Sequence, residues 1–228
     1  MKDIQVLSKI RYVKKAAIFD IDGTILKNRS SERVFFRYLL EKKVVTFKDL
    51  LQFAGVFLKN LFNLKGIYLR KNKYYLKNRE YAHIVSDMNQ CFQERISPHI
   101  STIALEEIAR LRRNGYFIIL MSGTLSPLVD CFVKRCNAHI GVGTSLEVND
   151  NGRITGEIDG IHAYSRGKVN VLARLAAEYN IDLSSSYAFA NQYLDAKFMQ
   201  MVGNPVAVNA STLLLFHAKM KQWKITDF

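Results

Sequence analysis

An apolar run that ends in two closely spaced carboxylates is the feature of this sequence that most limits its possible folds. The run spans residues 16–19 and leads into Asp20 and Asp22, which are separated by one residue and followed by Gly23. A short apolar run of this kind is typical of a buried strand in a parallel sheet. Because ligands of open α/β sheets bind beyond the carboxyl ends of the strands, the sequence predicts that both carboxylates lie at a binding crevice.

The pair formed by Asp20 and Asp22 also indicates a chemistry. Two carboxylates in one crevice repel each other unless a cation or a shared proton relieves the repulsion. Gly23 allows the backbone to turn sharply and to approach an anion. The motif therefore suits a Mg²⁺ site at which one carboxylate attacks phosphorus and the other carries a proton. The alternative is an ordinary acidic turn, because Asp and Gly are common turn residues.

The chain alternates strand-like and helix-like segments, with one interruption. Residues 25–96 carry apolar residues at helical spacing and no convincing strand, so they are predicted to form a helical insertion. The alternation resumes with a helix that begins at Pro98, with Ser97 as its N-cap. Further strands are expected at residues 116–121, 186–190 and 205–208, paired strands within 142–158, and helices at 125–136, 168–179, 195–202 and 212–223. This order predicts an α/β fold.

The net charge of +13 is distributed unevenly along the chain. Residues 27–98 contain fifteen Lys or Arg and only six Asp or Glu. A basic surface raises the local concentration of anionic ligands, such as phosphorylated metabolites, nucleic acids or acidic lipids. A solvated surface without a dedicated partner is the alternative for a charge run of this kind.

The cysteines and the N-terminal residues indicate a cytoplasmic protein. Cys91, Cys131 and Cys136 are odd in number and lack the spacing of a zinc site, so reduced thiols are expected. Residues 1–15 have scattered charges and no apolar stretch suited to a signal peptide. No apolar run reaches the length of a membrane span.

Two further segments carry groups that suit phosphate binding. Ser122, Gly123 and Thr124 follow the strand expected at residues 116–121, where a hydroxyl and backbone N–H groups would form an anion cradle. Lys168 opens a helix, where the helix dipole gives a cation no stabilisation. Neutralising a transferred phosphoryl group and the attacking Asp20 would explain that placement. A plain turn and a solvated lysine are the alternatives.

Taken in order, these segments resemble the haloacid dehalogenase (HAD) superfamily, and within it the phosphoserine-phosphatase-like subfamily IB. The resemblance covers nearly the whole chain and includes Thr155-Gly156 and the tail at residues 202–209. It implies a Rossmann-like core with a mainly parallel sheet, formed by residues 1–26 and 98–228. It also implies a helical cap domain of the C1 type, inserted after the first strand at residues 27–97.

The resemblance further implies Mg²⁺-dependent hydrolysis of phosphomonoesters through an aspartyl-phosphate intermediate. Asp20 would be the nucleophile, and Asp22 would protonate the leaving alcohol and then activate the water. Lys168 would complete the catalytic set. The residues that would hold the phosphoryl group are Gly23, Thr24, Ser122, Gly123 and Lys168, and those that would hold Mg²⁺ are Asp20, Asp22, Asn191 and Asp195.

The sequence departs from the family pattern after the strand at residues 186–190. The family has Gly-Asp-Ser there and a second Asp four residues after the first, whereas this chain has Ala190-Asn191-Gln192, and only Asp195 matches. An amide oxygen can bind Mg²⁺ but brings no negative charge. We therefore expect a phosphatase with a weakened metal site. The alternatives are a pseudophosphatase that binds a phosphorylated ligand, and a substitution that traps a complex.

The expected partner is a phosphorylated small molecule. The apolar stretch at residues 50–64 and the basic cluster from Lys65 to Lys73 could instead rest on an anionic membrane and present a lipid phosphate to the site. Packing within the cap is the favoured interpretation of that stretch. Nucleic-acid binding, suggested by the Lys and Tyr residues at 70–77, is disfavoured because no recognisable module contains them.

Overall fold

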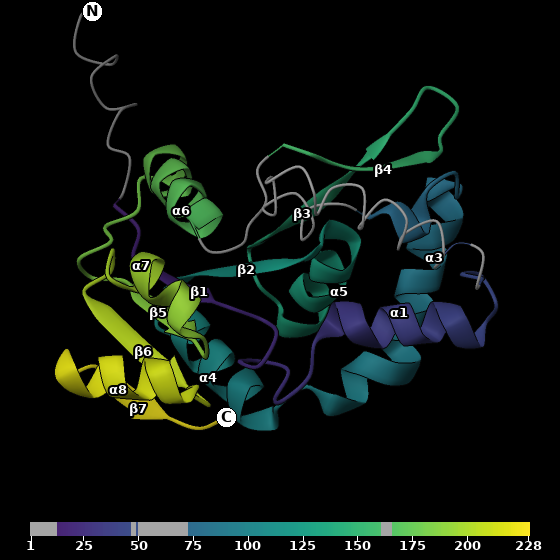
Figure 1. The fold of residues 1–228 in the computed structure, drawn as a ribbon. Coiled ribbons are helices and arrows are strands. Elements are labelled where there is room, and N and C mark those ends of the chain that lie inside the picture. The colour runs from purple at the N-terminus through teal and green to yellow at the C-terminus, as the bar shows by residue number, and fades with distance from the viewer. Residues whose placement is uncertain (1–12, 47–48, 50–72, 161–165) are drawn as a thin grey trace, which may run out of the picture.

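A seven-stranded sheet forms the centre of the protein (Figure 1). The computed structural model describes residues 13–46, 49, 73–160 and 166–228. The strands are β1 (Ala16–Phe19), β2 (Phe117–Leu125), β3 (Ile140–Val148), β4 (Ile154–Asp159), β5 (Tyr187–Ala190), β6 (Asn204–Val208) and β7 (Lys224–Thr226), in the spatial order β4-β3-β2-β1-β5-β6-β7. Neighbouring strands are parallel except β3 and β4. The predicted α/β fold with a mainly parallel sheet is confirmed.

Helices cover both faces of this sheet (Figure 1). They are α1 (Ser31–Glu41), α3 (Tyr81–Cys91), α4 (Thr102–Arg113), α5 (Ser126–Cys136), α6 (Arg166–Tyr179), α7 (Ala196–Met199) and α8 (Thr212–Met220). Ala17 and Phe19 of β1 pack in one core cluster with α4 and α5, and Ala16 and Ile18 pack in a second with α6, α7 and α8. Because β1 is buried on both faces, its sequence is a continuous apolar run.

The order of the strands places a crevice beside β1. The chain passes from β1 to β2, β3 and β4 on one side and then returns to β5 on the other side. The backbone N–H of Asp20 donates to the carbonyl of Phe189 in β5 over 2.9 Å, so the two strands stay paired up to this point. Such a reversal is a topological switch point, where open α/β sheets bind their ligands.

The described part of residues 27–97 forms helical elements. Besides α1 and α3, these are a 3₁₀ turn at Tyr74–Leu76 and a π-helical segment at Phe92–Ile96. The first lies on β4, since the N–H groups of Lys73 and Asn78 donate to the carbonyls of Gly156 and Ile154 over 2.6 and 2.8 Å. The boundaries of the cap domain, residues 27–97, stay a prediction. Residues 50–72, on which most of the alternative membrane contact rests, lie outside the described residues.

Two local predictions are wrong. Ser97 does not cap a long helix, because Ser97–His99 is a single 3₁₀ turn and α4 begins at Thr102, with Ser101 Oγ accepting from the N–H of Ala104 over 3.2 Å. Between them, Ile100 is extended and bridges to Leu26. The closing helix α8 ends at Met220 rather than at residue 223, and the following residues form β7, which pairs with β6.

Two observations bear on the remaining predictions from composition. Cys91, Cys131 and Cys136 are buried free thiols, as expected for reduced cysteines. In the part of the chain that the structure describes, no helix is both long enough and apolar enough to cross a membrane.

Candidate active site

The residues predicted from separate parts of the sequence meet at one cavity of about 430 Å³ beside the carboxyl ends of β1 and β5. Seven predicted site residues line it: Asp20, Asp22, Ser122, Gly123, Lys168, Asn191 and Asp195. Thr124, from the segment predicted as an anion cradle, lines it too. Gly23 and Thr24 do not line it but contact residues that do. Six lining residues were not predicted as site residues: Ser30, Glu32, Arg33, Lys73, Gln192 and Leu194.

A buried lysine bridges the two deepest carboxylates of the cavity. Nζ of Lys168 lies 2.5 Å from Oδ1 of Asp20 and 3.0 Å from Oδ2 of Asp195. Lys168 is 2% exposed and Asp20 6%. Burial works against the charge of Lys168, but the two carboxylates outweigh it and raise its pKa. Lys168 is therefore a permanent cation next to Asp20, in the first turn of α6 as predicted.

Asp195 is the second carboxylate that pairs with Lys168. It ends the 3₁₀ turn Tyr193–Asp195 and is buried. Desolvation raises its pKa to about 6, against the opposing charge of Lys168 and with a further contribution from Asp20.

The hydroxyl of Thr24 donates to the other oxygen of Asp20, Oδ2, over 3.2 Å. Thr24 therefore orients the carboxylate that Lys168 neutralises.

Asp22 is held by the first residues of α1. Oδ1 of Asp22 accepts from the N–H and the hydroxyl of Ser31 over 2.9 and 2.7 Å, and Oδ2 accepts from the hydroxyl of Ser30 over 3.3 Å. Desolvation by the surrounding protein raises the pKa of Asp22 to about 6, although the two bonds from Ser31 lower it. Asp22 therefore changes its protonation near neutral pH, as a proton carrier must.

The segment from Ser122 to Thr124 lines the cavity next to the start of α1. Ser122 Oγ accepts from the N–H of Thr124 over 3.2 Å, and the hydroxyl oxygens of Thr124 and Ser31 lie 3.1 Å apart. The pairing of β2 with β3 shifts in register between Met121 and Leu125, so this segment leaves the regular ladder. The predicted hydroxyl therefore lies at the cavity, while α5 begins only at Ser126.

Asn191 packs on the turn that separates Asp22 from Thr24. Gly23 has φ +85°, and a Cβ there would lie 1.9 Å from Nδ2 of Asn191. Asn191 is 8% exposed, and its Oδ1 is buried without a hydrogen-bond partner. A buried oxygen without a donor costs free energy unless a ligand satisfies it.

The residues present are compatible with a Mg²⁺ ion. The orphaned Oδ1 of Asn191 and the carboxylates of Asp20 and Asp195 line one cavity, and hard oxygen donors are the ligands that Mg²⁺ prefers. Lys168 takes up only one oxygen of each carboxylate. No group of three or more His, Cys, Asp or Glu side chains suited to a metal occurs among the residues with described positions. Any metal here would therefore depend on the amide of Asn191.

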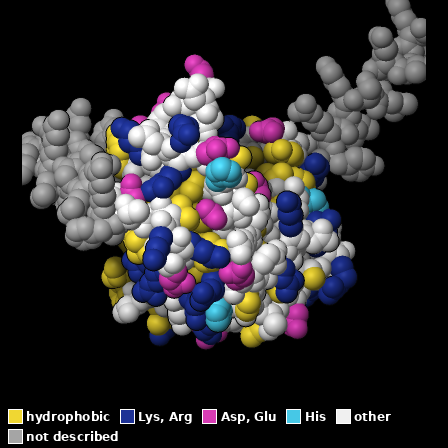
Figure 2. All heavy atoms as spheres, turned by 90° about the vertical axis from the view of Figure 1, so that its right-hand side faces the viewer, with side chains coloured by type: hydrophobic (Ala, Val, Ile, Leu, Met, Phe, Trp, Pro, Cys, Tyr) yellow, Lys and Arg dark blue, Asp and Glu magenta, His cyan; other side chains and the backbone are white. Residues whose placement is uncertain are grey.

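Glu32 and Lys73 form an ion pair at the outer wall of the cavity, which sequence reasoning missed. Nζ of Lys73 contacts Oε1 of Glu32, and the hydroxyl of Tyr75 donates to the same oxygen over 3.3 Å. Lys73 is 5% exposed. Its burial agrees with the favoured interpretation, packing within the cap, and removes Lys73 from the surface cluster of the membrane alternative. Figure 2 shows the face that carries α1 and α3, on which Asp and Glu side chains lie between the Lys and Arg side chains.

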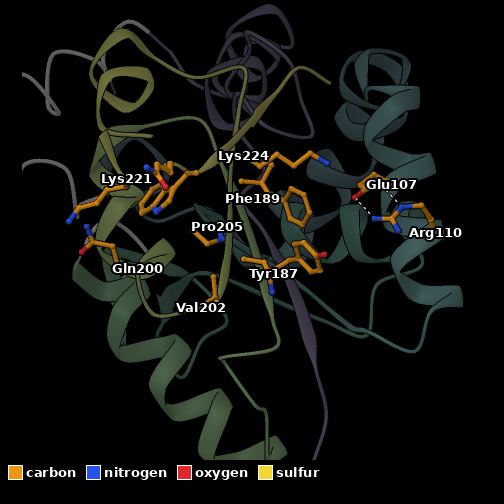
Figure 3. A pocket seen from close by; sticks show the side chains of 14 residues that line it. Glu107, Arg110, Tyr187, Phe189, Gln200, Val202, Pro205, Lys221 and Lys224 are labelled. Carbon is orange, nitrogen blue, oxygen red and sulfur yellow. Dashed lines mark hydrogen bonds and ion pairs between the residues drawn. The ribbon is translucent and has the colours of Figure 1, made fainter. Parts of the chain in front are cut away.

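A second cavity, of about 590 Å³, lies where β5 and β6 begin (Figure 3). Tyr187, Phe189 and Pro205 line its centre, and the ion pair of Glu107 with Arg110 closes one side. None of the predicted site residues lines this cavity. The predicted chemistry is therefore confined to the first cavity.

The fold and the site together define an α/β protein with buried carboxylates at the switch point of a mainly parallel sheet. Comparison with known families matches residues 17–200 to the haloacid dehalogenase-like hydrolases. The chain belongs to this family, which confirms the resemblance inferred from its motifs.

Curated relatives and solved structures agree with this assignment. The chain is 26% identical over 220 residues to phosphoserine phosphatase SerB1 of Mycobacterium tuberculosis, covering 93% of this chain and 70% of that protein. It is 25% identical over 222 residues to histidinol-phosphatase of Neisseria meningitidis, covering 95% of this chain and 100% of that protein. A Bordetella pertussis protein of unknown function superposes with a TM-score of 0.77 at 21% identity, covering 94% and 99% of the two chains. A phospho-aspartyl intermediate analogue of phosphoserine phosphatase superposes with a TM-score of 0.64 at 21% identity, covering 94% and 93%.

Proposed function

We propose that this chain is a Mg²⁺-dependent phosphatase that hydrolyses phosphomonoesters of small molecules through an aspartyl-phosphate. The observation that carries the proposal is the arrangement of Asp20, held 2.5 Å from the buried cation Lys168, in the same cavity as Asp22, which titrates near pH 6. One carboxylate is paired with a buried cation for attack, and the other can carry a proton. The relatives named as phosphatases support the same reaction class.

In the first step, an oxygen of Asp20 attacks phosphorus and the bond from phosphorus to the alcohol oxygen breaks. Asp22 in its acid form donates its proton to the departing oxygen, so that a neutral alcohol leaves. Lys168 and the hydroxyl of Ser122 offset the charge of the phosphoryl oxygens. Thr24 keeps the attacking carboxylate oriented through its bond to Oδ2 of Asp20.

In the second step, Asp22 in its base form takes a proton from water, which attacks phosphorus as the bond from phosphorus to Asp20 breaks. Inorganic phosphate leaves, and both carboxyl groups return to their starting states. Ser30 and Ser31 orient Asp22 in both steps, because they bind its two oxygens from the N-cap and the first residue of α1. The inserted segment would therefore act as a cap that also positions the proton carrier.

Asp20, the backbone carbonyl of Asp22, Asn191 and Asp195 would hold Mg²⁺, which when bound would neutralise the negative charge of the transferred phosphoryl group. The neutral amide of Asn191 would make this site weaker than one built from carboxylates alone. The buried free thiols agree with a reducing compartment, so we place the reaction in the cytoplasm.

The test is Mg²⁺-dependent release of phosphate from 4-nitrophenyl phosphate. We expect slow release by the native chain, loss of release in Asp20→Asn and faster release in Asn191→Asp, with circular dichroism showing that each variant is folded. An inert native chain that Asn191→Asp activates would identify a pseudophosphatase switched off at residue 191. Absence of release in both folded proteins would refute the proposed reaction.

A further inference from the structure

The cavity that contains Asp20 and Asp22 continues along α1 into a groove. This groove has a volume of about 420 Å³ and is lined by Ser30, Glu32, Arg33, Phe36, Arg37 and Tyr75. Ser30, Glu32 and Arg33 also line the cavity that contains Asp20 and Asp22. The part of a substrate that extends away from the phosphoryl group past these three residues would therefore enter the groove.

The floor of the groove is aromatic. The rings of Phe36 and Tyr75 meet edge to face, with centroids 5.2 Å apart and an interplanar angle of 90°. Phe36 comes from α1, and Tyr75 comes from the turn that lies on β4. Aromatic side chains in such a groove favour a flat apolar group, and the volume is within the range of ordinary small-molecule sites.

The charge of the one carboxylate in the groove, Glu32, is already balanced by a buried cation. Glu32 is ion-paired with the buried Lys73 and accepts a hydrogen bond from the hydroxyl of Tyr75. Because Lys73 already neutralises the charge of Glu32, a substrate ammonium would gain less from this carboxylate than from an unpaired one. Glu32 therefore provides no free negative charge to bind a positively charged leaving group.

The remaining charges of the groove are positive. Arg33 and Arg37 are exposed, lie four residues apart on one face of α1, and have no side-chain ion pair among the described residues. The other carboxylates of residues 27–97 have neighbours elsewhere: Glu41 with Arg95, Asp49 with Arg79, Glu80 with His83, Glu94 with Gln90, and Asp87 near Lys42. Residues 50–72 contain no Asp or Glu in their sequence. The groove is therefore a cationic site with an aromatic floor.

We propose that this groove binds the alcohol part of the substrate and selects a flat apolar group that carries an anion, such as a carboxylate, over one that carries an ammonium. Arg33 and Arg37 are the specificity residues, since a guanidinium binds a carboxylate through two parallel hydrogen bonds. This inference rests on the proposed phosphatase function and adds the class of its substrate.

The test compares two esters with the same reacting group, the phosphate monoesters of 4-hydroxyphenylacetate and of tyramine. They share a phenyl phosphate and differ in the charge at the far end of the side chain. We expect kcat/KM to be about tenfold or more higher for the carboxylate ester, which corresponds to about 1.4 kcal/mol. The double variant Arg33→Glu, Arg37→Glu should reverse the preference, and the conservative Arg33→Lys, Arg37→Lys should keep most of it.

Arg135→Ala is the matched control, because Arg135 is an exposed arginine on α5 that lines neither cavity. It should leave the ratio of the two kcat/KM values unchanged. An equal or higher kcat/KM for the tyramine ester in the native chain would overturn the inference.

A binding measurement separates this inference from the proposed reaction. The two corresponding benzylphosphonates, which cannot be hydrolysed, are titrated into the native protein by calorimetry with Mg²⁺ present. Tighter binding of the carboxylate analogue supports the groove even if neither ester is hydrolysed, a result that would refute only the phosphatase activity. Equal binding, tighter binding of the ammonium analogue, or no binding of either would overturn the inference.

Discussion

Asn191 and Gly23 are in direct contact: a Cβ at residue 23 would lie 1.9 Å from Nδ2 of Asn191. The contact joins the loop after β5 to the turn after β1, between the two carboxylates of the motif. The side chain of Asn209 adds to it by donating to the carbonyls of Gly23 and Thr24 over 3.2 and 3.4 Å. The position of Asn191 and the shape of the carboxylate turn therefore depend on each other.

The variant Gly23→Ala should lose both stability and activity. The new methyl group would meet the amide of Asn191 and would also occupy a backbone conformation with φ +85°. We expect a loss of about 2–4 kcal/mol in the free energy of unfolding, measured by urea denaturation, and a large loss of phosphate release.

Gly115→Ala is the control for backbone strain alone. Gly115 has a similar φ of +77°, but nothing lies within 4 Å of the Cβ position. Its cost should be about 1 kcal/mol, with activity retained. Equal destabilisation by the two substitutions would show that the contact with Asn191 contributes nothing.

The variant Asn191→Asp should bind Mg²⁺ more tightly than the native chain. It places a carboxylate where the buried Oδ1 now has no partner, and adds a negative charge to the ligand set. We expect the dissociation constant for Mg²⁺, measured by calorimetry, to fall by about tenfold. Gln192→Glu adds the same charge at the next residue of the same cavity and should have a much smaller effect. A similar gain in both variants would assign the effect to net charge rather than to coordination.

The site residues that could be predicted from sequence are those whose position follows from the strand that precedes them. Asp20 comes directly after an apolar run, Ser122 follows a second one, and each strand delivers its side chain to the same edge of the sheet. Asn191 was identified from the family resemblance, and its place directly after β5 brings it to the same edge. A local pattern was sufficient because parallel strands bring their carboxyl ends together.

The residues that could not be predicted depend on tertiary packing. Glu32 and Lys73 are 41 residues apart, and their contact exists because the turn at Tyr74–Leu76 lies on β4. A lysine in a basic stretch has no sequence signal for burial. Strand β7 was missed because its three residues are too few to show an alternating pattern. The N-cap of α4 was misplaced because Ser97 and Ser101 are both good capping residues, and the bridge of Ile100 to Leu26 decides between them.

The two steps of the reaction should depend on pH in opposite directions. Desolvation raises the pKa of Asp22 to about 6, so its acid form dominates below that pH and its base form above it. Formation of the aspartyl-phosphate needs the acid and should slow as pH rises through 6, whereas hydrolysis of the intermediate needs the base and should accelerate. Rapid-quench measurements of each step from about pH 4.5 to about pH 8, a range that brackets the pKa of about 6, would separate the two pH dependences. A first step that accelerates with pH would contradict the role of Asp22, and Asp22→Asn should abolish both dependences.

The variant Ser31→Ala should move this pH profile. The hydroxyl of Ser31 donates to Oδ1 of Asp22 over 2.7 Å and lowers the pKa of that carboxyl. Its removal should raise the pKa of Asp22 above 6 and cost about 1 kcal/mol of stability. The formation of the intermediate should then persist to higher pH. Ser101→Ala, which removes the N-cap of α4 away from the cavity, should cost similar stability without moving the profile. An unmoved profile in Ser31→Ala would exclude control of Asp22 by this bond.

Removing one partner of the ion pair between Lys73 and Glu32 should destabilise the protein more than removing both partners. Lys73→Met leaves the partly buried Glu32 without its cation, which should cost about 3 kcal/mol in the free energy of unfolding. The double variant Lys73→Met, Glu32→Gln removes both charges and should recover most of that loss, because neither group is then buried as an uncompensated ion. Urea denaturation of the native chain, the two single variants and the double variant forms a complete cycle. Additive losses would show that the two charges do not interact. A stable Lys73→Met variant would show that water reaches Glu32, and with it that the carboxylate is open to a substrate ammonium.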